Sequence, residues 1–285
     1  TIQNRGIEIA IGGTPVKTKD ITWALNYNFS MDRSKVLSLP EGAKKVLLNY
    51  IYSVNLYATE GQPLGVYEIP QPLYENGHIV VNSGGFPVQS PDQKIVGSIE
   101  PQFHMGLTSD LTVKDFDFGF TIDYQQGGKF YSNSAQLLEF TGQAQDTKYN
   151  DRENFIIPGS VQAVAGGGYT ENQTPITHGV YDTYYNIGGN PATAFNNLIL
   201  TRTYVKLREA TLGYKIPTSV AKKIGASSAR ISVFGRNLYT WLPASNRIVD
   251  PELINIGSGG IDSELGEDAS GPPLRFYGAK LNVTF

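Results

Sequence analysis

Few side chains in this sequence are spaced for chemistry. Its three histidines, His78, His104 and His178, lie far apart and lack the spacing of metal ligands. One acidic stretch could offer oxygen ligands to calcium, and its carboxylates are Asp262, Glu264, Glu267 and Asp268. Because the stretch lacks the regular ligand spacing and the glycine of an EF-hand loop, we expect a solvated acidic loop. We therefore predict no metal and no cofactor.

Catalytic motifs are also missing from the sequence. It has no nucleophile-elbow serine with histidine and aspartate partners, no zinc motif, and no Cys/His pair because it has no cysteine. A net charge of −3 with 17% charged residues gives no basic surface for nucleic acid. These absences favour a non-enzymatic protein that does not bind nucleic acid, with a hydrolase kept as a third possibility.

Binding is the chemistry that the aromatic residues suggest. A stretch rich in Gly, Asn and Thr, from about 127 to 197, carries Tyr169, Tyr181, Tyr184 and Tyr185. A tyrosine ring combines an apolar body with a polar tip, so it suits polar solutes as well as protein partners. We predict these four residues as contacts to a ligand or to a lid protein, with packing inside the loop as the alternative.

Two carboxylates, Asp117 and Asp123, belong to a stretch that reads as a strand. Large apolar residues alternate with small or polar ones in residues 116–125, FDFGFTIDYQ. Successive side chains of a strand point to opposite faces, so this strand needs one apolar and one wet environment. A transmembrane β-barrel provides both, and we predict that Asp117 and Asp123 face its lumen.

The same alternation marks other parts of the chain. Residues 21–31 place six large apolar residues in phase, and residues 276–285 place Tyr277, Leu281 and Phe285 on one face. No stretch approaches the roughly 18 apolar residues of a transmembrane helix, so a membrane-spanning chain would have to be a barrel. The aromatic final residue resembles the signal that barrel-insertion machinery reads, and we predict Phe285 as an assembly signal.

Connections between these strands alternate between short and long. Short ones are expected near 13–19, 113–114 and 216–229, and long polar ones at about 32–98, 127–197 and 242–273. Outer-membrane barrels have tight periplasmic turns and long external loops, so the long segments are predicted to be external. About seven antiparallel strands result, and an odd number cannot close. The predicted fold class is all-β, with residues 1–285 the carboxy-terminal segment of a larger transmembrane β-barrel.

Several local features are expected within this arrangement. Residues 12–15, Gly-Gly-Thr-Pro, are predicted to form the first turn, and residues 217–225 a short helical turn closed by Gly225. A third strand pair is expected over 198–214 and 230–241, with bulges near Arg208 and around Gly235 to Asn237. Strand-like pieces at 47–57 and 78–82 indicate that the first long loop is folded.

Longer motifs resemble the carboxy-terminal region of SusC/RagA-type TonB-dependent transporters. They are residues 204–217 (YVKLREATLGYKIP), 232–241 (SVFGRNLYTW), 250–252 (DPE) and 273–285 (PLRFYGAKLNVTF), with residues 4–8 (NRGIE) and 23–36 upstream. Because these motifs are distributed from end to end, the resemblance covers the whole chain.

The resemblance implies an outer-membrane barrel of about 22 strands with a plugged lumen. It also implies an importer of glycans or peptides that works with a SusD-like surface lipoprotein as its lid and draws energy from TonB. The plug, the TonB-contacting segment and the remaining strands have no counterpart in these residues. Energy coupling is therefore expected to lie in a missing amino-terminal part.

A soluble all-β carbohydrate-binding or adhesion module is the alternative from another class. Such a module also has alternating strands and aromatic loops. It requires, however, that the apolar face of each strand be buried against a second sheet. Detergent dependence separates the two interpretations, because a monodisperse protein without detergent would favour the module.

Overall fold

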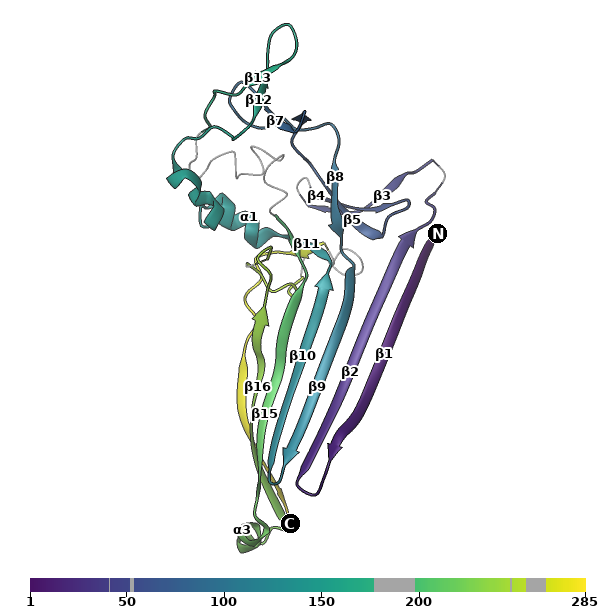
Figure 1. Ribbon diagram of the computed structural model, residues 1–285, viewed down its shortest axis with the longest axis vertical. Coiled ribbons are helices and arrows are strands. Elements are labelled where there is room, and N and C mark those ends of the chain that lie inside the picture. The colour runs from purple at the N-terminus through teal and green to yellow at the C-terminus, as the bar shows by residue number, and fades with distance from the viewer. Residues whose placement is uncertain (41, 52–53, 177–197, 247, 255–264) are drawn as a thin grey trace.

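Seven long strands form one antiparallel sheet, in the spatial order β1-β2-β9-β10-β15-β16-β18 (Figure 1). The computed structural model describes residues 1–40, 42–51, 54–176, 198–246, 248–254 and 265–285. The strand bounds are β1 Ile2–Lys17, β2 Ile21–Val36, β9 Pro101–Val113, β10 Phe116–Gly127, β15 Tyr204–Ile216, β16 Ser228–Trp241 and β18 Phe276–Thr284. These strands confirm the predicted all-β fold with about seven antiparallel strands.

The sheet has an apolar face and a polar face, as the alternation predicts. Phe118 lies beside Leu111 and Leu212 in the neighbouring strands, whereas Asp117 lies beside Thr112. The apolar face is not packed against another layer, because Phe118 is 46% exposed and Leu212 is 43% exposed. Other exposed members of this face are Ile7, Ile9, Ile11, Trp23, Phe116, Phe120, Ile231, Val233 and Leu281. A contiguous apolar surface of this kind marks a membrane or partner contact and does not fit a soluble sandwich.

Short connections lie at one end of the sheet and long ones at the other (Figure 1). In the first short turn, the Thr18 hydroxyl accepts hydrogen bonds from the N–H groups of Asp20 (3.3 Å) and Ile21 (3.0 Å). The predicted turn at residues 12–15 is wrong, because β1 continues through them with one extra residue between Gly13 and Val16. Such a bulge interrupts the ladder, so a proline without an N–H is tolerated there.

The other two short connections lie where the sequence predicts them. Lys114, in the second, has a left-handed φ of 52°. The third is helical and consists of α3 (Thr218–Ala221) and η2 (Lys222–Ile224). It ends at Gly225, whose φ of 77° lies in the region that favours glycine. The predicted helical turn is therefore confirmed.

Two bulges interrupt β15 and β16 where the alternation changes phase. Against β10, the register of β15 passes from Glu209 to Leu207, which leaves Arg208 as an extra residue. In β16, Asn237 has a left-handed φ of 51°, and its side-chain amide donates to the Leu274 carbonyl at 3.2 Å. Both predicted bulges are confirmed, and the second one ties β16 to the segment that precedes β18.

The long connections are folded, as expected for the first of them. It contains β3 Lys45–Ile51, β4 Val54–Thr59, β5 Leu64–Ile69, β6 Tyr74–Glu75, β7 His78–Val81 and β8 Lys94–Ser98. The second contains β11 Lys129–Ser132, α1 Asn133–Phe140, η1 Gln145–Arg152, β12 Val161–Ala163, β13 Tyr169–Glu171 and β14 Ile199–Thr201, and the third contains β17 Gly266–Glu267. Among the described residues, no helix has the length and apolarity to span a membrane.

One hydrophobic core joins all three long connections. Fully buried side chains come from the first (Leu56, Tyr67), the second (Phe130, Leu198) and the third (Leu265). The prediction that residues 198–201 begin the third strand pair is wrong, because residues 199–201 pair with β11 beside this core. Three consecutive apolar residues are buried there, which is a core pattern and not the alternation of a two-faced strand.

Candidate functional site

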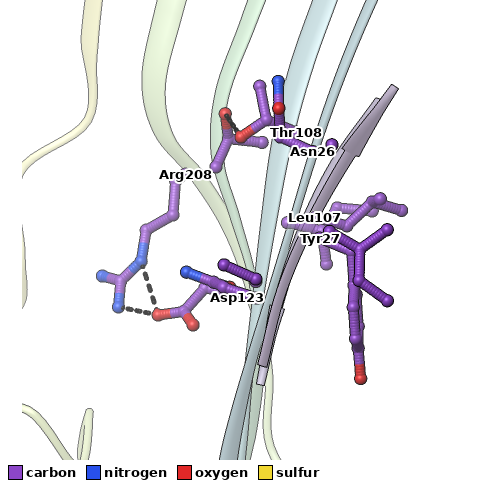
Figure 2. A pocket seen from close by; sticks show the side chains of 13 residues that line it. Asn26, Tyr27, Leu107, Thr108, Asp123 and Arg208 are labelled. Carbon is purple, nitrogen blue, oxygen red and sulfur yellow. Dashed lines mark hydrogen bonds and ion pairs between the residues drawn. The ribbon is translucent and has the colours of Figure 1, made fainter. Parts of the chain in front are cut away.

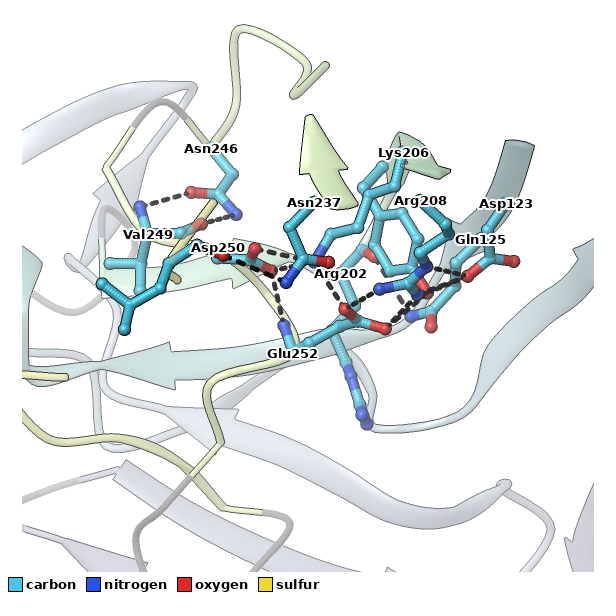
Figure 3. Close-up of polar contacts among 12 residues, drawn as sticks. Asp123, Gln125, Arg202, Lys206, Arg208, Asn237, Asn246, Val249, Asp250 and Glu252 are labelled. Carbon is cyan, nitrogen blue, oxygen red and sulfur yellow. Dashed lines mark hydrogen bonds and ion pairs between the residues drawn. The ribbon is translucent and has the colours of Figure 1, made fainter. Parts of the chain in front are cut away.

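A cluster of charged side chains occupies the polar face where β10 and β15 approach the long connections (Figure 3). Lys206 on β15 contacts both oxygens of Asp250, at 2.6 and 2.7 Å, and one oxygen of Glu252 at 2.5 Å. Arg208 donates to Glu252 at 2.6 Å and pairs with Asp123 of β10. The cluster therefore fastens the third long connection to the wall of the sheet.

The strand geometry explains how these residues meet. Tyr204, Lys206 and Arg208 are two residues apart, so the period of the strand puts them on one face. The bulge at Arg208 then allows Glu209 to share that face, where it pairs with Arg236 at 2.8 Å. The Tyr204 hydroxyl completes the cluster by donating to Glu252 at 3.0 Å.

Burial makes one pair in the cluster more costly to break than the others. The side chains of Lys206 and Asp250 are 7% and 6% exposed, whereas that of Glu252 is 38% exposed. A buried pair persists only when hydrogen bonds satisfy its charges, and the two bonds from Lys206 to Asp250 do so. The two cations and the three carboxylates, including Asp123, leave one net negative charge.

The pKa of Glu252 makes this anchor sensitive to acid. Burial raises the pKa of its carboxyl, but hydrogen bonds and charge from Arg208 and Lys206 outweigh burial and lower the pKa to about 2. Because the folded pKa lies below the ordinary 4.5, the ionised carboxylate contributes stability above pH 4.5 that is lost as the pH falls towards 2.

We predict that a spin label at the exposed Ile248 becomes more mobile as the pH falls from 4.5 towards 2. Glu252→Gln should remove the transition, and a label whose mobility stays constant in the unsubstituted protein would contradict the prediction.

Beside the cluster, the polar face carries a hollow of about 480 Å³. Its polar lining comes from four strands and consists of Asn26, Asn28, Thr108, Thr121, Asp123 and Arg208. Figure 2 shows Asp123 and Arg208 paired on one side of the sheet, with Tyr27 and Leu107 on the other. Amides, hydroxyls and charged groups offer both hydrogen-bond donors and acceptors, which suits an uncharged polar solute.

Glycine residues give this hollow its room. A side chain at Gly106 would meet the Asn28 amide oxygen at 2.1 Å from its Cβ, and one at Gly12 would meet the Asn26 amide oxygen at 2.6 Å. Each asparagine therefore lies over a glycine of the neighbouring strand. Larger residues at these two positions would displace the amides and fill the hollow.

The predicted site residues have different outcomes. Asp117 and Asp123 share the polar face, and both are paired: Asp117 with Arg230 at 2.8 Å, and Asp123 with Arg208. Tyr169 is 43% exposed on β13. Tyr181, Tyr184 and Tyr185 lie outside the described residues.

The acidic stretch differs from its prediction where the structure describes it. Glu267 is fully buried and not solvated, because it accepts hydrogen bonds from the Ser134 N–H and hydroxyl, both at 2.9 Å, and from the Ser132 hydroxyl. Asp268 accepts a hydrogen bond of 2.5 Å from the Asn133 side chain. Asp262 and Glu264 lie outside the described residues, and no metal-ligand cluster occurs within the described ones.

Sequence reasoning missed the partners within the charged cluster. Lys206, Arg208, Asp250 and Glu252 stood in the family-like motifs, but no role was assigned to them. The alternation of Tyr204, Lys206 and Arg208 indicated a shared polar face. Nothing in the sequence linked that face to two acids more than 40 residues away.

Three curated proteins are similar to this chain, although no family model matches it. TonB-dependent receptors P3 and P26 of Formosa agariphila are each 24% identical over 311 aligned residues, covering 100% of this chain and 29% of each relative. TonB-dependent receptor SusC of Bacteroides thetaiotaomicron is 27% identical over 136 residues, covering 43% of this chain and 14% of that protein. The chain thus spans about 29% of the length of the first two curated relatives.

Solved structures show the same fold. The RagAB peptide transporter matches with a TM-score of 0.64 and 17% identity, covering 100% of this chain and 29% of that chain. The RagAB peptide importer in its 'closed-closed' state matches with a TM-score of 0.65 and 18% identity, covering 100% of this chain and 30% of that one. The seven-stranded sheet is therefore arranged like part of the RagA barrel.

An exposed apolar face, a hollowed polar face and long folded connections at one end define the wall of an outer-membrane β-barrel. The sequence relatives narrow this class. The chain aligns from end to end with part of TonB-dependent receptors and has the fold of part of the SusC/RagA type.

Proposed function

We propose that residues 1–285 are the carboxy-terminal segment of an outer-membrane importer for peptides or glycans. The two-faced sheet carries this proposal, because its apolar face suits lipid and its polar face suits a wet lumen. Asp117 and Asp123 then line the lumen, and the connections at about 32–98, 127–197 and 242–273 are external. A protein of this type transports its solute without chemical turnover.

The hollow beside the charged cluster is the proposed solute contact of this segment. Peptide bonds and sugar hydroxyls both exchange hydrogen bonds with amides and hydroxyls, so the lining of the hollow fits either class. The similarity to the RagAB peptide transporter supports peptides as the solute. The similarity to SusC points to no single solute, so we keep both peptides and glycans. Tyr169, with Tyr181, Tyr184 and Tyr185, is proposed to contact the solute or a lid.

We also propose partners for the complete receptor of which this segment would be a part. A SusD-like surface lipoprotein would close over the external connections, and TonB would act through a plug formed by other residues of the same protein. The core shared by the three connections supports a folded platform for such a lid. The charged cluster and Glu267 hold the third connection against that platform.

Uptake by cells tests this function. We expect deletion of the full-length receptor to abolish uptake of labelled oligopeptides or of labelled oligosaccharides. The double variant Asn26→Leu/Asn28→Leu should reduce uptake at equal surface abundance, and Tyr27→Leu on the opposite face is the matched control. Unchanged uptake of both solute classes after deletion would overturn the proposal.

Phe285 provides a separate prediction about assembly. The residue follows β18 and is 84% exposed, so its replacement removes little packing from the folded chain. If the terminal aromatic is an assembly signal, Phe285→Asp lowers the amount of receptor in the outer membrane, measured by immunoblotting of membrane fractions. Asn282→Asp, on the polar face of the same strand, is the control. Equal amounts of both variants would remove the assembly role.

A further inference from the structure

The helical connector between β15 and β16 folds onto the apolar face of the sheet. Its two buried alanines, Ala221 and Ala226, belong to a small hydrophobic cluster that also contains Ile216, Ala229 and Val283. The strand registers place the last three side by side, in phase with the rest of the apolar face. The connector therefore lies on the side of the sheet that we assign to lipid, at the end with the short turns (Figure 1).

The outer side of this connector combines apolar and basic groups. Val220 and Ile224, one helical turn apart, are 50% and 64% exposed. Lys222 and Lys223 are also exposed, and residues 217–227 contain no acidic side chain. Exposed apolar residues interleaved with lysines on a short helix are typical of a segment that lies in a membrane interface.

We propose that the connector formed by residues 217–227 is an interfacial anchor that binds anionic phospholipid headgroups of the periplasmic leaflet. This inference rests on the proposed orientation of the barrel. Val220 and Ile224 enter the boundary of the acyl chains, and Lys222 and Lys223 bind headgroup phosphates. The other short turns lack this combination, because residues 18–20 and 114–115 form no helix and carry no large apolar side chain.

Position and charge favour a lipid surface as the occupant. The connector continues the apolar face without a break, since its alanines cover the last strand residues of that face. A soluble periplasmic partner would approach from the water side, where it would not cover this face. Two uncompensated positive charges are complementary to anionic phosphate, and each basic residue near such a surface strengthens binding by up to about fivefold.

Environment-sensitive labels in the full-length receptor test the position of the connector. In three separate variants, a single cysteine replaces Ile224, Val233 or Lys19 and carries a fluorescent dye. Each variant is placed in lipid nanodiscs whose brominated lipids quench the fluorescence of a dye that contacts them. We expect quenching at Ile224 and at Val233 of the apolar face, and none at Lys19 in the first short turn. Quenching at Val233 without quenching at Ile224 overturns this inference and leaves the proposed function intact. Absence of quenching at Val233 contradicts the orientation of the barrel itself.

Lipid counting tests the charge requirement. In nanodiscs with equal neutral and anionic phospholipid, native mass spectrometry of the extracted receptor should show anionic lipid enriched on the protein. The double variant Lys222→Gln/Lys223→Gln should lower the enrichment by up to about fivefold per lysine. The control is Lys215→Gln, which should leave the enrichment unchanged, because Lys215 lies on the polar face, opposite Arg230 in the strand register. Equal enrichment in all three proteins overturns the inference.

Discussion

Phe120→Lys is expected to destabilise the folded receptor by about 2–4 kcal/mol in a lipid bilayer. Phe120 lies on the apolar face, midway along β10 between two aromatic residues, Phe116 and Tyr124. The ring centroids of Phe116 and Tyr214 are 4.8 Å apart, and those of Tyr124 and Phe103 are 5.5 Å apart. Aromatic girdles mark the two interfaces of a barrel, so Phe120 lies near the midplane, where a lysine charge is most costly.

Thr121 supplies the matched control for this substitution. It is the next residue of the same strand, at nearly the same depth, but its side chain lies on the polar face beside Thr108, 3.3 Å away. Thr121→Lys keeps its ammonium among water and carboxylates and should change stability by less than about 1 kcal/mol. Urea titrations of both full-length variants in lipid vesicles measure the difference. Similar losses would mean that the two faces are not in contact with lipid and water as proposed.

Alternation made the strands and their faces predictable from the sequence. A two-faced strand repeats every two residues, so the phase of 116–125 or of 276–285 determines which side chains share a face. The registers bear this out, since most residues of the apolar face lie opposite apolar residues of the neighbouring strands; Ser109, opposite Leu25 and Phe120, is an exception. The predicted first turn was wrong for a physical reason: glycine and proline also occur in bulges, and sequence alone does not separate a bulge from a turn.

Contacts between side chains far apart in the chain could not be predicted from the sequence. The phase of β15 shows that Lys206 is on the polar face, but its partner Asp250 comes from a connection that returns after a full hairpin. Glu267 is a similar case, because an acid in a polar stretch suggests solvent, whereas here hydroxyl and N–H donors at the start of α1 satisfy it in a buried position. Such contacts depend on how connections fold together, and local composition carries no signal for them.

Lys206→Ala is expected to be the most damaging change in the charged cluster. Removing one partner of a buried, hydrogen-bonded pair leaves an uncompensated charge and costs about 3–5 kcal/mol. Here the unpaired group would be Asp250, whose side chain is 6% exposed. We expect the third connection to detach from the wall before the barrel unfolds. Amide hydrogen exchange should therefore accelerate in residues 248–254 while β10 and β15 stay protected.

Two further variants separate the pair from a general effect of charge. Arg236→Gln removes an exposed partner on the same face, because Arg236 is 61% exposed and pairs with Glu209, so it should cost less than about 1 kcal/mol. Lys206→Met/Asp250→Leu removes both buried charges and should recover most of the stability lost in Lys206→Ala. If Lys206→Ala and Arg236→Gln had equal effects, the buried pair would not anchor the connection. Because the hollow lies beside the cluster, loss of solute uptake in Lys206→Ala with recovery in the double variant would connect this anchor to transport.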